Sequence, residues 1–219
     1  MKDIPARKGK YYLRRLIEEG EHEHQDFKYA ISDARKIARS ISAFANNDGG
    51  RLLIGVKDNG AVVGVPNEED IYMVEHAAEA YCLPPQKIDV TAFVAEGGAV
   101  VLRVDIARCE RRPVYCREEN NRHVAYYRVA DENIAAHPLM VRAWELQGGD
   151  EPVGFSFTSE ELEAIAVINA ATGGVAPDDF YRHVRLSRQR AEHLLVRLIC
   201  LGSIVMRHTP RGFLIDPAE

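Results

Sequence analysis

The sequence lacks the features that mark several common classes of protein. Apolar runs such as 99–102 are far too short to span a bilayer. No hydrophobic stretch follows the basic start at 1–10, which argues against a secretory signal. The cysteines are few: Cys82, Cys109, Cys116 and Cys200. They form no CxxC pair and no zinc-ligand spacing, so we expect a cytoplasmic protein with free thiols and no membrane partner.

A strong charge of either sign is also missing. The 33 acidic and 28 basic residues give a formal net charge of −5, which argues mildly against indiscriminate nucleic-acid binding. A local basic face can still supply phosphate contacts. Apolar residues make up 46% of the chain, an ordinary share for a globular protein, and 219 residues suit one core with a small appendage.

The first two thirds of the chain alternate between helical and strand patterns. Helical spacing of apolar residues predicts helices at 11–19, 34–45, 68–81 and 137–146. Ser32 or Asp33 can cap the second of these helices. Strand patterns occur at 21–28, 51–57, 61–65, 88–94, 100–106, 113–116 and 124–129. This order predicts an α+β domain over 1–148, with a mixed or antiparallel sheet and flanking helices.

The remaining residues follow a different plan. Residues 147–153 have the composition of a linker. Three helices are then expected at 160–171, 177–183 and 188–201, followed by short strands at 203–207 and 212–215. Helix, helix, helix, hairpin is the order of a winged helix-turn-helix. We therefore expect a small C-terminal domain of that type over 154–219.

Three pieces of sequence occur in register within 21–65. The first is EHEHQDFK at 21–28, the second is SAFANNDGG at 42–50, and the third is LIGVKDNG at 53–60, followed by VGV at 63–65. Together they make the chain resemble the Schlafen-type AlbA domain across roughly 10–130. One departure is visible, because the family usually has Glu at the position of Asp26. The resemblance implies nucleic-acid binding.

A phosphate-facing surface is expected around the turn at 46–50. Adjacent glycines allow positive φ and close approach of the main chain, and their amides can form an anion-binding concavity. The candidate residues are Asn46, Asn47, Gly49 and Gly50 in the turn, with Lys28, Arg51 and Lys57 on neighbouring strands. The alternative is that the glycines only turn a helix into a strand and that the basic residues are merely solvated.

Three acidic residues raise the question of catalysis. In RNA-cleaving Schlafen proteins, acids at the positions matching Glu21, Asp26 and Asp58 form a metal-dependent nuclease site. The resemblance thus implies Mg²⁺ or Mn²⁺ there, with Lys28 offsetting charge. Asp58 is also a favoured turn residue, however, and Glu21 can simply end an exposed strand. We favour binding without catalysis and therefore expect no cofactor.

Two further patterns near the motif carry less weight. His22 and His24 alternate on the expected strand 21–28, so both imidazoles would lie on one face. They could bind a metal ion together, but a solvent-exposed edge strand is the simpler interpretation. The stretch 50–57 has the glycine spacing of a P-loop. It lacks the Lys and Ser/Thr that should follow, and it reads as a strand, so we reject nucleotide binding by this motif.

The expected recognition helix carries its own candidates. Ser187, Arg188, Gln189 and Arg190 fall in its first turn, and Arg211 falls on the wing. Acidic residues elsewhere bring this domain close to neutral, and winged helices also serve as dimerisation modules. The leading hypothesis is a homodimeric, DNA-binding transcriptional regulator, with DNA favoured over RNA. The alternatives are a metal-dependent ribonuclease and a module that only pairs subunits.

Overall fold

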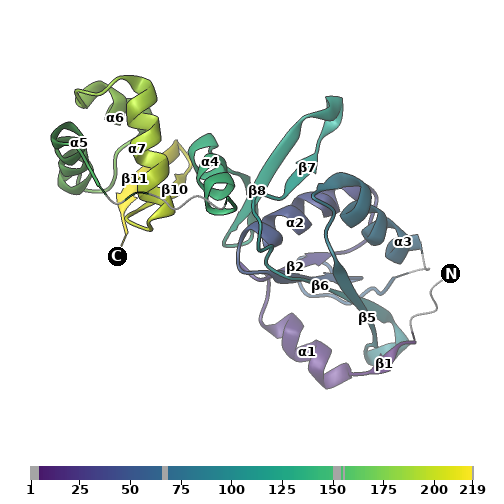
Figure 1. Cartoon of the computed structure of the whole chain (residues 1–219). Helices are drawn as coiled ribbons and strands as arrows, with labels where there is room; N and C mark the ends of the chain where they lie inside the picture. The colour runs from purple at the N-terminus through teal and green to yellow at the C-terminus, as the bar shows by residue number, and fades with distance from the viewer. Residues whose placement is uncertain (1–4, 66–68, 150–153, 155, 219) are drawn as a thin grey trace. The chain divides into compact units, whose positions relative to one another are not determined.

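The computed structural model describes residues 5–65, 69–149, 154 and 156–218. The chain divides into two compact units, Met1–Ala135 and Ala136–Glu219, each of which is treated by itself (Figure 1). None of the helices in the described ranges is long and apolar enough to cross a membrane.

The first unit is built on a five-stranded mixed sheet with the order β1-β5-β6-β3-β2. The strands are β1 (Arg7–Lys8), β5 (Ile88–Val94), β6 (Val100–Ile106), β3 (Gly50–Ile54) and β2 (Gln25–Lys28). The central pairs β5·β6 and β6·β3 are antiparallel, whereas β2·β3 and the short β1·β5 pair are parallel. The expected α+β class with a mixed sheet is therefore confirmed.

The two faces of this sheet are covered by different helices (Figure 1). Alternate residues of a strand point to opposite faces, and β3 divides its side chains accordingly. Leu52 and Ile54 pack into the cluster that contains α2 (Ala34–Asn46). Leu53 instead packs with Leu13 and Leu16 of α1 (Lys10–Glu18). The sheet is thus buried on both sides, which explains the continuous apolar run of β3.

Helix α2 is the centre of the first unit. The Asp33 side chain caps it by accepting a 2.9 Å hydrogen bond from the Arg35 amide, as expected for an N-cap aspartate. Its far end leads into the turn before β3. The other helical segments of this unit are α3 (Glu69–His76), the π-turn η1 (Ala77–Tyr81) and the 3₁₀ turns η2 (Glu96–Gly98) and η3 (Glu119–Asn121).

A second, antiparallel sheet packs against α2 in the same unit, in the order β4-β7-β8-β9. Its strands are β4 (Cys82–Leu83), β7 (Tyr115–Arg117), β8 (His123–Val129) and β9 (Glu132–Ala135). The strand expected at 61–65 does not form, and a single bridge joins Val56 to Val62 instead. The positive φ of Gly64 and its hydrogen bond to the Gly55 carbonyl bend this segment back across the sheet end.

The second unit contains α4 (Pro138–Gln147), α5 (Ser159–Ala170), α6 (Pro177–His183), α7 (Arg188–Cys200) and the hairpin β10 (Ile204–Thr209)·β11 (Gly212–Pro217). A capping box between Thr158 and Glu161 starts α5, and the Ser187 hydroxyl caps α7. Phe180, Ile168 and Leu194 lie at the centre of its core.

Helix α4 belongs to the second unit, although its sequence position suggested that it closes the first. Leu139 and Ala143 are buried among the residues of α5 and α7. The compact units therefore divide between Ala135 and Ala136, before α4 rather than at the linker-like stretch 147–153. Of that stretch, 150–153 lie outside the described residues. Turn-forming composition marks where the chain bends, whereas the packing of the apolar face of α4 decides its unit.

Candidate functional site

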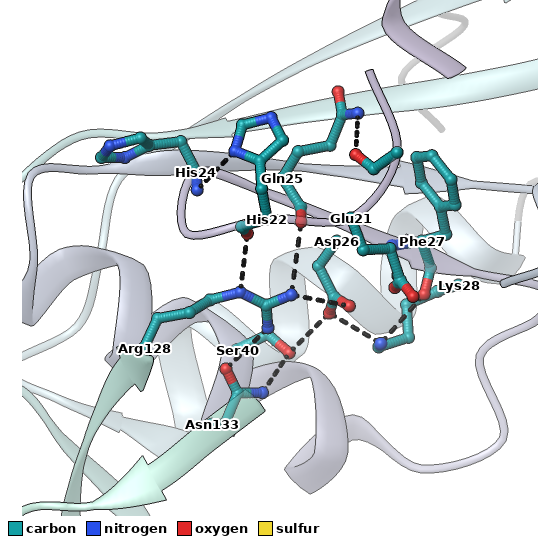
Figure 2. A network of polar contacts seen from close by, with 11 residues as sticks. Glu21, His22, His24, Gln25, Asp26, Phe27, Lys28, Ser40, Arg128 and Asn133 are labelled. Carbon is teal, nitrogen blue, oxygen red and sulfur yellow. Dashed lines mark hydrogen bonds and ion pairs between the residues drawn. The ribbon is translucent and has the colours of Figure 1, made fainter. Parts of the chain in front are cut away.

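Asp26 is the centre of a buried polar network in the first unit (Figure 2). Its side chain is 3% exposed. Oδ2 lies 2.6 Å from Lys28 Nζ and accepts a 3.1 Å hydrogen bond from the Ser40 hydroxyl of α2. Oδ1 lies 3.2 Å from Nη2 of Arg128 on β8. Both carboxylate oxygens are therefore engaged by the protein itself, and the network ties β2 to α2 and β8.

Arg128 is a fully buried guanidinium that the sequence-based candidates did not include. It donates to the carbonyls of His22 and Gln25 at 3.1 and 3.2 Å and to Oδ1 of Asn133 at 2.9 Å. It also lies over the Phe44 ring, 5.1 Å from the centroid. The signal that could have found it is a charged residue at an inward position of strand β8, whose alternation is otherwise apolar on that face.

Glu21 lies beside Asp26 (Figure 2), and the pKa values of the two carboxyl groups shift in opposite directions. Burial, followed by a side-chain hydrogen bond with Asp26, raises the pKa of Glu21 to about 7. Burial also acts to raise the pKa of Asp26, but the charge of Lys28, the hydrogen bond with Glu21 and the charge of Arg128 outweigh it and lower that pKa. Below about pH 7 the pair therefore holds one proton, on Glu21, while Asp26 stays ionised.

The three acids proposed for catalysis do not assemble as a metal site. Asp58 is exposed on the turn after β3, and one oxygen of Glu21 already accepts a 2.9 Å hydrogen bond from the Phe27 amide. In the described part of the chain, no group of three or more His, Cys, Asp and Glu side chains is arranged to hold a metal ion. With both oxygens of Asp26 occupied, these residues do not fit a divalent cation in this arrangement.

The two asparagines of the motif hold the end of α2 against the second sheet. The Asn46 amide donates to the carbonyls of Val114 and Tyr126 at 2.9 and 2.8 Å and accepts from the Val114 amide at 2.7 Å. Asn47 exchanges two hydrogen bonds with the Arg128 main chain, at 2.9 and 3.1 Å. Asn46 is 1% exposed, so its side chain acts within the fold rather than toward a ligand.

The glycines of the motif border a surface hollow of about 440 Å³. Gly49 has φ +81°, and a Cβ there would lie 2.8 Å from the Ile106 carbonyl oxygen. The Gly49 amide donates to the Phe44 carbonyl and the Arg51 amide to the His24 carbonyl, so these main-chain donors are used internally rather than left as an anion nest. Lys87 also lines the hollow, together with Asp48, Asp89 and Asp105.

The three basic residues expected to contact phosphate differ in whether a carboxylate already neutralises them. Arg51 is ion-paired with Glu19 and donates to Gln25 Oε1 at 2.6 Å. Lys28 is held by Asp26. Lys57 is exposed and lies 5.4 Å from the Tyr29 ring centroid, with no carboxylate partner among the described residues. Of the three, only Lys57 has a charge that is both exposed and unmatched.

His22 and His24 do not lie on a strand, because β2 begins at Gln25 and the preceding residues form a turn closed by a bridge between His22 and Gln25. His22 Nδ1 accepts from the His24 amide at 3.1 Å, and His24 Nδ1 lies 3.0 Å from the Gly49 carbonyl oxygen. One ring nitrogen of each is thus occupied. Burial and then the charge of Arg51 lower the pKa of His22.

Four of the five candidates of the second unit lie at the start of α7, and the fifth, Arg211, lies in the hairpin turn. Arg188 donates to Glu192 Oε1 at 3.1 Å and lies over the Tyr181 ring at 4.7 Å. Arg190 forms a 2.8 Å ion pair with Glu160. Gln189 and the guanidinium of Arg211, in the turn between β10 and β11, have no side-chain partner among the described residues.

Residues 21–137 match the family described as Schlafen, AlbA_2. The chain belongs to this family. The Schlafen AlbA_2 match begins at Glu21 and runs past Arg128, so it includes the whole Asp26 network. It covers the three motif pieces on which the resemblance was based.

Two of the solved structures to which the chain is similar have low sequence identity to it. The DIP2311 protein from Corynebacterium diphtheriae is 18% identical, with a TM-score of 0.45 over 88% of this chain and 34% of that one. The N-terminal domain of a RecG-related protein from Nitrosomonas europaea is 22% identical, with a TM-score of 0.42 over 57% of this chain and 91% of that one. The chain thus spans about a third of the DIP2311 chain. No curated protein matches it.

Proposed function

We propose that this chain is a nucleic-acid-binding protein that prefers DNA to RNA and acts as a homodimeric, cytoplasmic transcriptional regulator. The observation that carries the proposal is the start of α7, where Ser187 caps the helix and Arg188, Gln189 and Arg190 occupy its first turn. The order α5, α6, α7, β10, β11 is that of a winged helix-turn-helix, in which this turn faces the major groove. Membership in the Schlafen AlbA_2 family supports the same function for the first unit.

The first unit would contribute phosphate contacts through exposed cations that have no carboxylate partner in the described part of the chain. Lys87 lines the hollow beside Gly49 and Gly50, and Lys57 is exposed after β3. Lys28 is unsuitable for this role because it neutralises Asp26. Contacts of this kind position a duplex without reading its sequence, so we assign specificity to the start of α7.

The proposal is tested by fluorescence anisotropy with a labelled duplex in a series of salt concentrations. Arg188→Ala, Arg190→Ala and Lys87→Ala should each weaken binding, and loss of a phosphate contact should reduce the salt slope by about 1. Arg14→Ala is the matched control, because Arg14 is an exposed arginine whose ion pair, among the described residues, is with Glu18 on α1. Equal affinity of all four variants and the unchanged protein would refute these contacts.

The homodimer is tested separately by sedimentation equilibrium. We expect a concentration-dependent mass of two chains and operator half-sites about one helical turn apart. A single-chain mass at all concentrations, together with unchanged duplex binding, would leave a monomeric DNA-binding protein.

Metal-dependent RNA cleavage is the weaker alternative, because the oxygens of Asp26 already accept from Lys28, Ser40 and Arg128. We expect no Mn²⁺-dependent cleavage of structured RNA. Cleavage by the unchanged protein that is lost in Asp58→Ala would reverse this choice.

A further inference from the structure

The second unit contains a cavity of about 460 Å³, and of the residues proposed to contact DNA at the start of α7 only Arg188 lines it. Its walls come from the first turns of α4, from α6, from the first turns of α7 and from the turn between β10 and β11. All these elements belong to the same compact unit. The volume falls within the range of small-molecule sites in proteins, about 300–1,000 Å³.

The charges around this cavity are unbalanced toward the positive. Three guanidiniums line it, those of Arg142, Arg188 and Arg211, against the carboxylates of Glu192 and Asp178. Arg142 and Arg188 share Glu192, at 2.9 and 3.1 Å. The Asp178–Arg188 pair is 3.7 Å long, with side chains 77% and 68% exposed, and is weak for that reason. One positive charge is left unmatched.

Arg211 provides that unmatched charge. Its guanidinium has neither an ion pair nor a hydrogen bond with any described residue, although it lines the cavity. His137, the N-cap residue of α4, also lines the cavity but adds no charge at neutral pH. Burial lowers its pKa, and its Nδ1 accepts a 3.2 Å hydrogen bond from the Leu139 amide. An anion is therefore the ligand whose charge the cavity would balance.

Aromatic rings form other parts of the wall. Tyr181 lies under the Arg188 guanidinium, 4.7 Å from it. Phe213 packs edge-on against His137 at 5.2 Å. Flat, unsaturated groups stack well on such rings, and an arginine held over a ring is already oriented for a bidentate contact.

We propose that this cavity binds a nucleotide unit, with its phosphate held by Arg211 and Arg142 and its base placed against Tyr181. The same chemistry is offered by a free mononucleotide and by one residue of a nucleic-acid strand. The site shares Arg188 and Arg211 with the residues expected to contact DNA, whereas Arg142 and Tyr181 belong to the cavity alone.

The test is isothermal titration calorimetry of the full chain with deoxyadenosine 5′-monophosphate. Deoxyadenosine, which lacks the phosphate, and inorganic phosphate, which lacks the base, are the matched probes. We expect the monophosphate to bind and each partial probe to bind at least about ten-fold more weakly, since each lacks one of the two groups that the site would contact. A single-stranded oligonucleotide is titrated in parallel to distinguish a strand from a free nucleotide.

Three variants assign the binding to the cavity. Arg142→Ala and Arg211→Ala should each weaken monophosphate binding about ten-fold, whereas Arg185→Ala, an exposed arginine outside the lining, should not change it. Circular dichroism melts check that each variant is folded. Arg190→Ala, which lies outside the cavity, should weaken duplex binding alone and so separates this site from the proposed DNA contacts.

The possible outcomes decide the matter. Binding of the monophosphate with losses only in the two cavity variants supports a free-nucleotide site. Binding of the oligonucleotide alone, with the same two losses, supports the site with a strand as its source. No binding of either probe, or an equal loss in Arg185→Ala, overturns the proposal.

Discussion

At the residue scale, the contacts of Asp26 show why an acidic residue of a family motif need not bind a metal ion. Asp26 is ionised in a site from which water is largely excluded, and it stays so because a lysine, an arginine and a hydroxyl surround it. The same contacts that make the carboxylate stable remove the free oxygen atoms that a metal ion would need.

Removal of the buried guanidinium should be strongly destabilising. We expect Arg128→Leu to lower the free energy of unfolding of the first unit by about 3–5 kcal/mol, because it leaves a buried carboxylate incompletely compensated. Arg108→Leu is the control, since its ion pair with Asp48 is exposed and should contribute at most about 1 kcal/mol. Urea titrations of both variants measure the difference, and similar midpoints would contradict the structural role of Arg128.

Glu21 should make stability depend on pH in a defined direction. Its pKa rises from 4.5 to about 7 on folding, so the folded state binds the proton more tightly. The stabilisation is full below pH 4.5 and is lost as pH rises through about 7. Glu21→Gln keeps the hydrogen bonds of the protonated acid but does not titrate.

We therefore expect the stability of Glu21→Gln, relative to the unchanged protein, to increase between pH 5 and pH 7 and to level off above pH 8. Chemical unfolding at a series of pH values measures this difference. The lowered pKa of His22 has the opposite pH dependence in this range, but both proteins share it, so it cancels. A difference that does not change with pH would contradict the raised pKa.

At the element scale, the end of α2 shows how a short motif acts through the backbone. Gly49 must adopt positive φ to connect α2 to β3, and it passes close to the Ile106 carbonyl of the neighbouring strand. Gly97, in the β5–β6 turn, has the same φ of +81°, but a Cβ there would meet nothing within 4 Å. A comparison of the two glycines therefore distinguishes the cost of the left-handed backbone conformation, which both share, from the cost of the steric contact, which only Gly49 has.

Gly97→Ala should cost about 1–2 kcal/mol, the penalty for an L-residue in the left-handed region. Gly49→Ala should cost more, because the main chain of β6 must also move away from a Cβ contact of 2.8 Å. Thermal unfolding followed by circular dichroism compares the two variants. Equal losses would mean that the close approach at Gly49 has no energetic consequence.

Long elements were well predicted from periodicity, and short ones were not. The apolar stripe of α2 and the alternation in β5 and β6 are visible locally, because each such element buries one face many residues long. Strands β1 and β4 have two residues each. Such strands exist only because a partner is present, and no local pattern indicates them.

At the scale of the whole molecule, the two units have separate cores. Among the residues that the structure describes, the clusters around α2 and α1 contain none beyond 135, and the cluster of the second unit contains none before 136. Each unit therefore buries its own apolar surface, which is the condition for folding alone.

We predict that the fragment 136–219 unfolds cooperatively by itself, whereas 149–219, which lacks α4, is less stable by several kcal/mol. Loss of α4 removes Leu139 and Ala143 from the core, and removing a buried leucine side chain costs about 2–5 kcal/mol. Thermal melts of both fragments measure the difference. Equal stability would place the boundary at the linker-like stretch rather than before α4.

The sequence by itself determined the α+β class, the helix-to-strand turn at Gly49 and the membership in the Schlafen AlbA_2 family, because these depend on residues that are neighbours in the chain. Only the tertiary structure decided what the motif residues do. Arg128 meets Asp26 across two elements, Asn46 binds the second sheet, and Asp58 stays on an exposed turn. The physical reason is that burial and charge pairing depend on which distant segments meet, and such contacts leave no periodic signal along the chain.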